Sequence, residues 1–258
     1  MIIDFIDFFK NGIGRVSGMF TLEHLIYVIT SLLIVFSLLY ITRKKSNEEI
    51  FKIIKIVSVV FLLLEILKII WNLTLREVVT VNDWIPLYFC SFFIYASLTF
   101  AFYTNKQSIV HKFALYFLFY GGITGGLAFL LLPTTALEVF PLLHVLSFHS
   151  LFYHSFMVTC AIWSLRFFTP KLSDIKIYGL FVIIIEALVV IINLICETNF
   201  MLLNKSFGLV ILDKIYEFSP VLYPVISSIG QMLLTFFVGY GIYYFIIRHL
   251  THKKINHE

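Results

Sequence analysis

Long apolar stretches alternate with short polar segments along almost the whole chain. A helix of about 20 mostly apolar residues crosses about 30 Å of hydrocarbon. Seven stretches have this length: Phe20–Ile41, Ile53–Leu73, Ile85–Tyr103, Phe113–Leu132, Phe148–Phe168, Ile175–Cys196 and Tyr223–Arg248. The pattern predicts an all-α membrane protein in which residues 1–258 form a single bundle of seven transmembrane helices.

Two further segments are apolar on one face only. Residues 1–19 combine Phe and Ile with Asp4, Asp7 and Lys10, which is typical of an amphipathic helix lying at the membrane interface. The longest loop, Glu197–Pro220, contains a similar segment near Phe207–Phe218.

The basic residues indicate how the bundle is oriented, because Lys and Arg favour cytoplasmic loops. Of the 19 Lys and Arg residues, 13 flank the loops after the first, third and fifth stretches or lie near the C-terminus. They are Arg43, Lys44, Lys45, Lys52, Lys55, Lys106, Lys112, Arg166, Lys171, Lys176, Arg248, Lys253 and Lys254. This distribution predicts a multi-pass protein of the cell membrane with its N-terminus outside and its C-terminus in the cytoplasm.

The composition agrees with a membrane protein. Apolar residues make up 60% of the chain and charged residues 13%, against about 45–50% and 25% in soluble domains. The net charge of +4 is explained by topology, so we expect no nucleic-acid partner. Cys90, Cys160 and Cys196 all lie in apolar runs, which argues against a disulfide framework.

Ionisable residues inside a bilayer are costly and therefore mark candidate functional positions. In the predicted topology most of them lie in the outer half: His24, Glu65, Lys68, His149 and His154, with Glu186 central and the polar Asn193 beyond it. We interpret this as a polar cavity that opens to the outer leaflet. Glu65 and Lys68 share a helix face, either as a packing pair or to hold a lipid head group.

Cys90 is predicted to lie about five residues, or roughly 8 Å, into the third helix, with Pro86 in its first turn. His154 has a similar depth on another helix, and Ser150 shares its face and could orient the ring. An adjacent imidazole can activate a thiol as a nucleophile, although a lone Cys in an apolar helix is more often inert. His149 and His154 lack metal-ligand spacing, so we expect no metal.

The fourth stretch carries Gly121, Gly122, Gly125 and Gly126, two overlapping Gly-x-x-x-Gly pairs. Such pairs allow a neighbouring helix to approach closely. Close packing is the favoured interpretation, and space for a lipid chain is the alternative.

Several short motifs, in order and over most of the chain, resemble the YwaF-like bacterial integral membrane proteins, a family distantly similar to a eukaryotic Cys/His transmembrane family that remodels ether phospholipids by acyl transfer. The motifs are FTLEH (Phe20–His24), Glu65-x-x-Lys68-x-x-Trp71, PLYFC (Pro86–Cys90), the Gly-rich stretch ending at Pro133, LFYHS around His154, NFMLLNK (Asn199–Lys205) and SPVLYP (Ser219–Pro224).

The resemblance implies that Cys90 and His154 form the catalytic pair, with a thioester intermediate that passes an acyl chain to a lysolipid. It implies supporting positions at His24, Glu65, Lys68 and Asn199. Tyr88 stands where family members often carry His.

Three classes of function remain open at this point. The first is a lipid-remodelling acyltransferase, with membrane lipids as environment and substrate and with no cofactor. The second is a small transporter or channel in which Glu65, Lys68, Glu186 and His154 form a relay. The third is a non-catalytic membrane scaffold, whose polar residues only specify helix packing.

Overall fold

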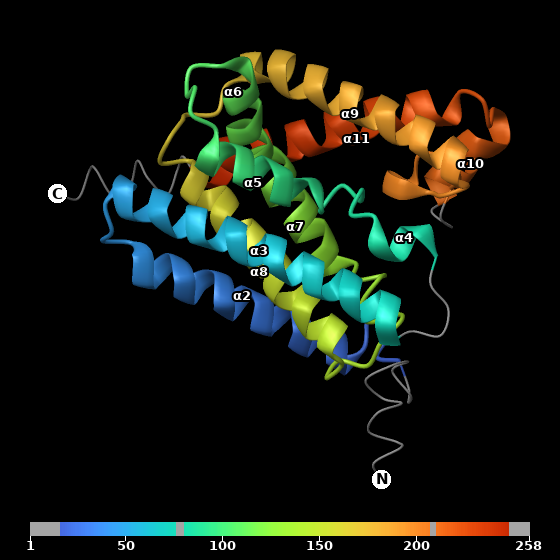
Figure 1. The fold of residues 1–258 in the computed structure, drawn as a ribbon, viewed down its shortest axis with the longest axis horizontal. Helices are drawn as coiled ribbons and strands as arrows, with labels where there is room; N and C mark the ends of the chain where they lie inside the picture. The colour runs from blue at the N-terminus through green and yellow to red at the C-terminus, as the bar shows by residue number, and fades with distance from the viewer. Residues whose placement is uncertain (1–15, 76–79, 207–209, 248–258) are drawn as a thin grey trace, which may run out of the picture.

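The computed structural model describes residues 16–75, 80–206 and 210–247, and these residues form helices, turns and loops without a β-strand. The α-helices are α2 (Leu22–Thr42), α3 (Asn47–Leu75), α4 (Val81–Trp84), α5 (Phe92–Phe102), α6 (Ile109–Tyr116), α7 (Gly122–Leu131), α8 (Val145–Ser164), α9 (Ile175–Cys196), α10 (Val210–Phe218) and α11 (Tyr223–Ile242) (Figure 1). Short 3₁₀ turns lie at η2 (Leu172–Asp174) and η3 (Phe200–Leu202), and π-helical turns at η1 (Phe117–Gly121) and η4 (Tyr243–Ile247).

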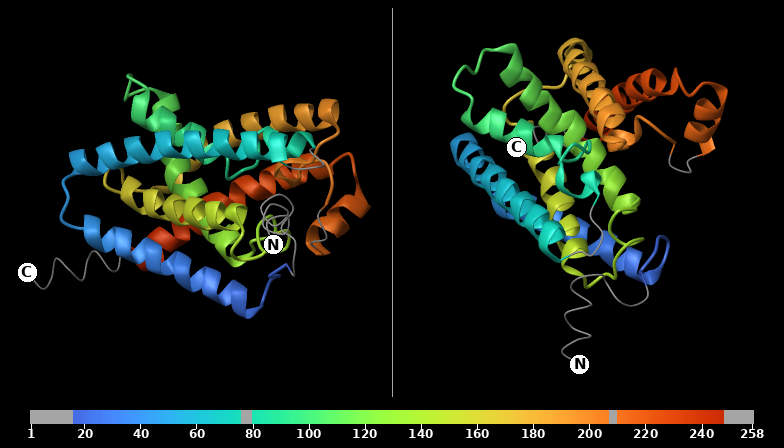
Figure 2. Two further views of the ribbon diagram at one scale, coloured as in Figure 1. Left: turned by 60° about the horizontal axis from the view of Figure 1, so that its bottom comes forward. Right: turned by 45° about the vertical axis from the view of Figure 1, so that its right-hand side comes forward.

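The centre of the molecule is one long helix, in which the π-turn η1 joins α6 to α7. Leu118, Phe119 and Tyr120 of η1 are fully buried. An interior position is expected for a helix that is apolar on every face. This helix packs against α5, α8, α9 and α11, so that α2, α3 and α8 lie on one side of it and α9 and α11 on the other (Figure 2).

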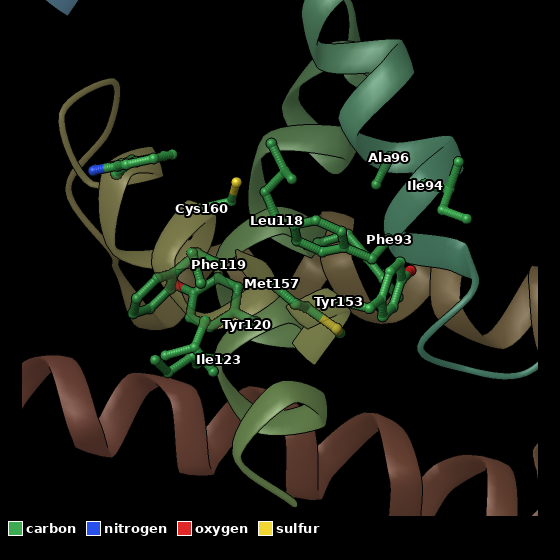
Figure 3. Packing of buried hydrophobic residues seen from close by; sticks show 14 of the residues in the cluster. Phe93, Ile94, Ala96, Leu118, Phe119, Tyr120, Ile123, Tyr153, Met157 and Cys160 are labelled. Atoms are coloured by element: carbon green, nitrogen blue, oxygen red, sulfur yellow. The ribbon is translucent and has the colours of Figure 1, made fainter. Parts of the chain in front are cut away.

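Glycines bring the central helix close to α8. Gly122 faces Phe93 of α5 and Ala161 of α8, while Gly126 faces Val158 and the carbonyl oxygen of His154. Figure 3 shows the aromatic and aliphatic side chains of α5, η1 and α8 meeting at this point. The glycine face is therefore filled by helix packing, as the favoured interpretation of the Gly-x-x-x-Gly pairs predicted.

The outer surface of the helices is apolar. Large side chains such as Leu33 and Phe36 of α2 and Leu194 of α9 are exposed. Within the described residues, five helices are long and apolar enough to cross a membrane: Leu22–Thr42, Ile109–Leu131, Val145–Ser164, Leu172–Cys196 and Tyr223–Ile246. An apolar exterior is stable only in a hydrocarbon solvent, so the fold is that of a helical membrane protein.

The prediction of one continuous helix over Ile85–Tyr103 was wrong. The helix begins at Phe92 and has 11 residues, a length of about 16 Å at 1.5 Å per residue. Pro86 lies outside any helix, and Ile85 before it is extended with φ −90° and ψ 116°. Proline disfavours the helical conformation of the residue before it, which explains the break between α4 and α5.

The other predicted stretches each coincide with a long helix, although α3 carries Glu65 and Lys68 within its apolar run. The short helix α10 covers most of the amphipathic segment predicted near Phe207–Phe218. The interfacial helix predicted over residues 1–19 falls almost entirely outside the described residues.

We predict that Gly126→Ala destabilises the fold. A Cβ atom at this position would lie 2.6 Å from Cγ2 of Val158. Valine has one strongly preferred rotamer in a helix, so α7 and α8 would have to separate, at a cost typical of overpacking, about 1–3 kcal/mol. The measurement is the midpoint of thermal unfolding in detergent.

Gly230→Ala in α11 is the matched control, because nothing lies within 4 Å of a Cβ atom added there. Both substitutions gain about 1 kcal/mol of helix propensity, so only Gly126→Ala is expected to lower the midpoint. Equal midpoints for the two variants would contradict the close packing of α7 on α8.

Candidate functional site

Cys90 lies in the turn that leads into α5, partly exposed. Its carbonyl oxygen accepts hydrogen bonds from the backbone N–H of Phe93 (3.0 Å) and from the hydroxyl of Tyr153 in α8 (2.8 Å). The prediction that Cys90 lies inside a helix was therefore wrong, since the residue precedes the first helical residue of α5. The Tyr153 bond nevertheless attaches this turn directly to the helix that carries His154.

A buried ion pair lies on α3 beside this turn. Lys68 Nζ is 2.6 Å from Glu65 Oε1, although the two groups are not aligned as a hydrogen bond. Glu65 is buried, whereas the Lys68 side chain keeps 27% of its surface exposed. The Lys68 ammonium interacts electrostatically with Cys90, and also with the two histidines of α8, His149 and His154.

The hydrogen bonds of His154 indicate its tautomer. Nδ1 lies 2.8 Å from the carbonyl oxygen of Ser150 and 3.3 Å from its hydroxyl. A carbonyl only accepts, so Nδ1 carries the proton and Nε2 has a free lone pair. Nε2 is buried without a hydrogen-bond partner, and the ring stacks on Phe129 of α7 at 3.7 Å between centroids.

A groove of about 860 Å³ runs between α3 and α8. Its α3 wall extends from Val57 to Leu75, about 27 Å along the helix axis. Almost all of its lining is aliphatic or aromatic, and Lys68 and His149 contribute the ionisable groups of the lining. The ring of His149 lies parallel to that of Tyr153, with 6.0 Å between centroids.

The structure thus brings Glu65, Lys68, Cys90, Ser150 and His154 to the facing parts of α3, α8 and the α5 turn. It does not join the thiol to the imidazole, because Nε2 of His154 has no hydrogen-bond partner and Nδ1 is bonded to Ser150.

His24 lies at the contact between α2 and α7. Its Nδ1 accepts from the backbone N–H of Phe20 (3.1 Å), and its Nε2 lies 3.3 Å from the carbonyl oxygen of Leu130. Both ring nitrogens are used by backbone groups, so His24 holds the start of α2 against the end of α7.

Asn193 and Asn199 organise the loop after α9. Asn193 accepts from the backbone N–H of Phe200 (2.8 Å) and donates to its carbonyl oxygen (3.0 Å), while Asn199 bonds the backbone of Asn204 and Lys205. Tyr88 packs its ring on Phe200, at 5.4 Å between centroids. These residues form a loop anchor beside the Cys90 turn.

Glu186 belongs to a different helix pair. It is buried on α9 and faces Ser228 of α11, and neither carboxylate oxygen has a hydrogen-bond partner. The helix α3, which carries Glu65 and Lys68, packs instead on α5 and α8. Among the described residues, Glu65 and Glu186 therefore lie in different helix pairs.

The sequence interpretation missed Tyr153, Phe129 and Tyr27. Tyr153 looked like one more aromatic residue, yet it makes the bond between α8 and the Cys90 turn. Tyr27 of α2 is fully buried and faces Ser150, without a hydrogen bond to its hydroxyl. No spacing in the sequence distinguishes these three residues from the many other aromatic residues.

The fold and the buried polar cluster define a helical membrane protein with a largely buried candidate site. A family model described as the TMEM164 family matches residues 19–240, and the chain belongs to this family. Neither the curated proteins nor the solved structures gave a match.

We predict that Lys68→Met destabilises the protein because it leaves the buried Glu65 carboxylate without its cation. Breaking a fully buried pair costs about 3–5 kcal/mol, and the partial exposure of Lys68 lowers this to about 2 kcal/mol. The thermal unfolding midpoint in detergent measures the effect. Lys52→Met on the same helix is the control, because its pair with Glu48 is 66% and 78% exposed and its loss should leave the midpoint unchanged.

We predict that Tyr153→Phe releases the Cys90 turn. The lost hydrogen bond is worth about 0.5–1.5 kcal/mol, and the rate at which a small maleimide modifies Cys90 should rise. Tyr27→Phe is the control, because the hydroxyl it removes has no hydrogen-bond partner. Equal labelling rates in both variants would show that the Tyr153 bond does not restrain the turn.

Proposed function

We propose that this TMEM164-family protein is a lipid-remodelling acyltransferase of the YwaF-like group, with Cys90 as nucleophile and His154 as general base. The observation that carries the proposal is the tautomer of His154. Its Nδ1 proton is held by the carbonyl of Ser150, which leaves Nε2 as a buried, unpartnered acceptor on the helix that Tyr153 ties to Cys90. A general base requires such a lone pair.

The groove between α3 and α8 supports a lipid substrate. Its long apolar walls suit an acyl chain, and the side chains of Lys68 and His149 line it beside Tyr153. A cation at this position attracts the phosphate or the developing oxyanion of an ester. The lysine therefore orients the lipid, while Glu65 neutralises it when no lipid is bound.

The reaction proceeds in two half-reactions. In the first, Nε2 of His154 accepts the thiol proton while the Cys90 sulfur attacks the ester carbonyl of a donor phospholipid. The C–O bond breaks, the lysolipid oxygen takes the proton from the imidazolium, and a thioester remains. In the second, the hydroxyl of an acceptor lysolipid gives its proton to Nε2 and attacks the thioester, which releases the thiol.

The proton transfer requires Cys90 Sγ to come within hydrogen-bond distance of Nε2. Catalytic hydrogen bonds often reach this distance only when substrate is bound. Cys90 precedes a helix rather than lying within one, so its side chain can turn without unwinding α5.

We also propose that the protein lies in the cell membrane, crosses it in seven segments and has its N-terminus outside. In this arrangement α5 and the turn before it form the third segment, and the catalytic cluster opens toward the outer leaflet. The clustering of basic residues near Arg43, Lys106 and Arg166 supports this orientation.

The test is labelling of the protein in lipid nanodiscs with an alkyne-tagged acyl thiol-reactive probe. We expect the wild type to be labelled at Cys90, and we expect Cys90→Ala to abolish labelling. His154→Gln should reduce the labelling rate by about 10²-fold or more, in the range of general-base catalysis. Cys160→Ala is the control, because this thiol lies buried in α8 and should not contribute.

Transfer of a deuterated acyl chain from phosphatidylcholine to lysophosphatidylethanolamine, followed by mass spectrometry, tests turnover in the same samples. Undiminished transfer by Cys90→Ala would refute the proposal. If Cys90 were labelled as fast in His154→Gln as in the wild type, the imidazole of His154 would not be the general base.

A further inference from the structure

A second hollow, of about 500 Å³, lies at the other end of α3, α5 and α8 from the Cys90 turn. It is lined by Phe51, Phe100, Lys106, His111, Lys112, Leu115, Tyr116, Phe167 and Phe168. Along α3 it lies near the first helical turns, whereas Glu65 and Lys68 lie four turns further on. The hollow is therefore separate from the candidate acyltransferase site.

The groups of this lining that can carry a charge near neutral pH, Lys106, His111 and Lys112, are all basic. Lys106 Nζ donates to the carbonyl oxygen of Phe100 (2.9 Å) and lies over the ring of Phe51, 5.1 Å from its centroid. No carboxylate of the described residues forms an ion pair with Lys106 or Lys112. Burial and the neighbouring positive charge of Lys55 lower the pKa of Lys106. Within the described part of the chain no nearby negative charge offsets these two effects.

His111 supplies a buried polar atom without a partner. The residue is 7% exposed, its ring lies 5.2 Å from that of Phe100, and its Nε2 has no hydrogen-bond partner. His111 and Lys112 also belong to the first turn of the helix that begins at Ile109, where the helix dipole favours an anion.

One buried carboxylate faces the wall of the hollow. Asp174 lies beside Tyr116 of this wall, and it accepts hydrogen bonds from the Tyr120 hydroxyl (2.9 Å) and from the backbone N–H of Lys171 (2.8 Å). Among the described residues it forms no ion pair with Lys106 or Lys112.

We propose that this hollow binds a phosphate group that carries net negative charge, with Lys106, Lys112 and His111 as donors. Basic pockets between membrane helices recognise the head groups of anionic lipids. The aromatic walls formed by Phe51, Phe167 and Phe168 suit the glycerol and upper acyl region of such a lipid. A soluble phosphate compound is the other source of the same group.

The experiment measures binding to the full-length protein in a neutral detergent by native mass spectrometry. The probes are dioctanoyl phosphatidylglycerol, dioctanoyl phosphatidylcholine, whose phosphate is neutralised by choline, and inorganic pyrophosphate. We expect phosphatidylglycerol to bind more tightly than phosphatidylcholine. Lys106→Gln and Lys112→Gln should each weaken it about fivefold, and the double variant about 25-fold.

Lys44→Gln is the matched control, because it removes an exposed loop lysine outside the hollow and should leave binding unchanged. Lys106→Arg with Lys112→Arg keeps both charges and should retain binding, which separates charge from a folding defect. Lysine-dependent binding of pyrophosphate without phosphatidylglycerol would support the site and assign it to a soluble ligand. Binding that falls equally in Lys44→Gln, or no lysine-dependent binding of either anion, would overturn the proposal.

Discussion

The close approach of α7 to α8 at Gly126 determines where the polar residues of the molecule meet. A side chain at this position would collide with Val158 and reach the backbone of His154. Because the helices touch there, Phe129 of α7 lies flat against the His154 ring, whose Nδ1 is bonded to Ser150. The orientation of the candidate base thus depends on the absence of a side chain on the neighbouring helix.

A second constraint is that lipid offers no hydrogen bonds, so each buried polar group requires a partner within the protein. His24, Asn193 and Asn199 fulfil this requirement through backbone groups, and their polarity is explained by helix contacts and loop geometry. Glu186 and Nε2 of His154 do not fulfil it. In a low-dielectric interior such unsatisfied groups are the ones that call for a functional explanation.

The sequence predicted the helices well where a long apolar run is uninterrupted, as in α2, α9 and α11, because burial in lipid depends on length and hydrophobicity alone. It failed at Ile85–Tyr103, where one proline divides the run and leaves α5 short. Because of this error the sequence placed Cys90 inside a helix, whereas the structure places it in a turn. The direction in which each side chain points could not be predicted from the sequence, since the neighbours Tyr153 and His154 contact different elements, the Cys90 turn and α7.

The two ends of the bundle differ in how their charges are balanced. Beside Cys90, Lys68 is paired with Glu65, so the lipid that we propose as substrate would have to compete with the carboxylate for this cation. At the other end no carboxylate of the described residues pairs with Lys106 or Lys112, and Asp174 accepts a hydrogen bond from Tyr120. An anion that binds at the first end would replace Glu65 as the partner of Lys68. An anion at the second end would form a new ion pair with Lys106 or Lys112. A protein that remodels lipids at one end and holds a charged lipid at the other would need this difference.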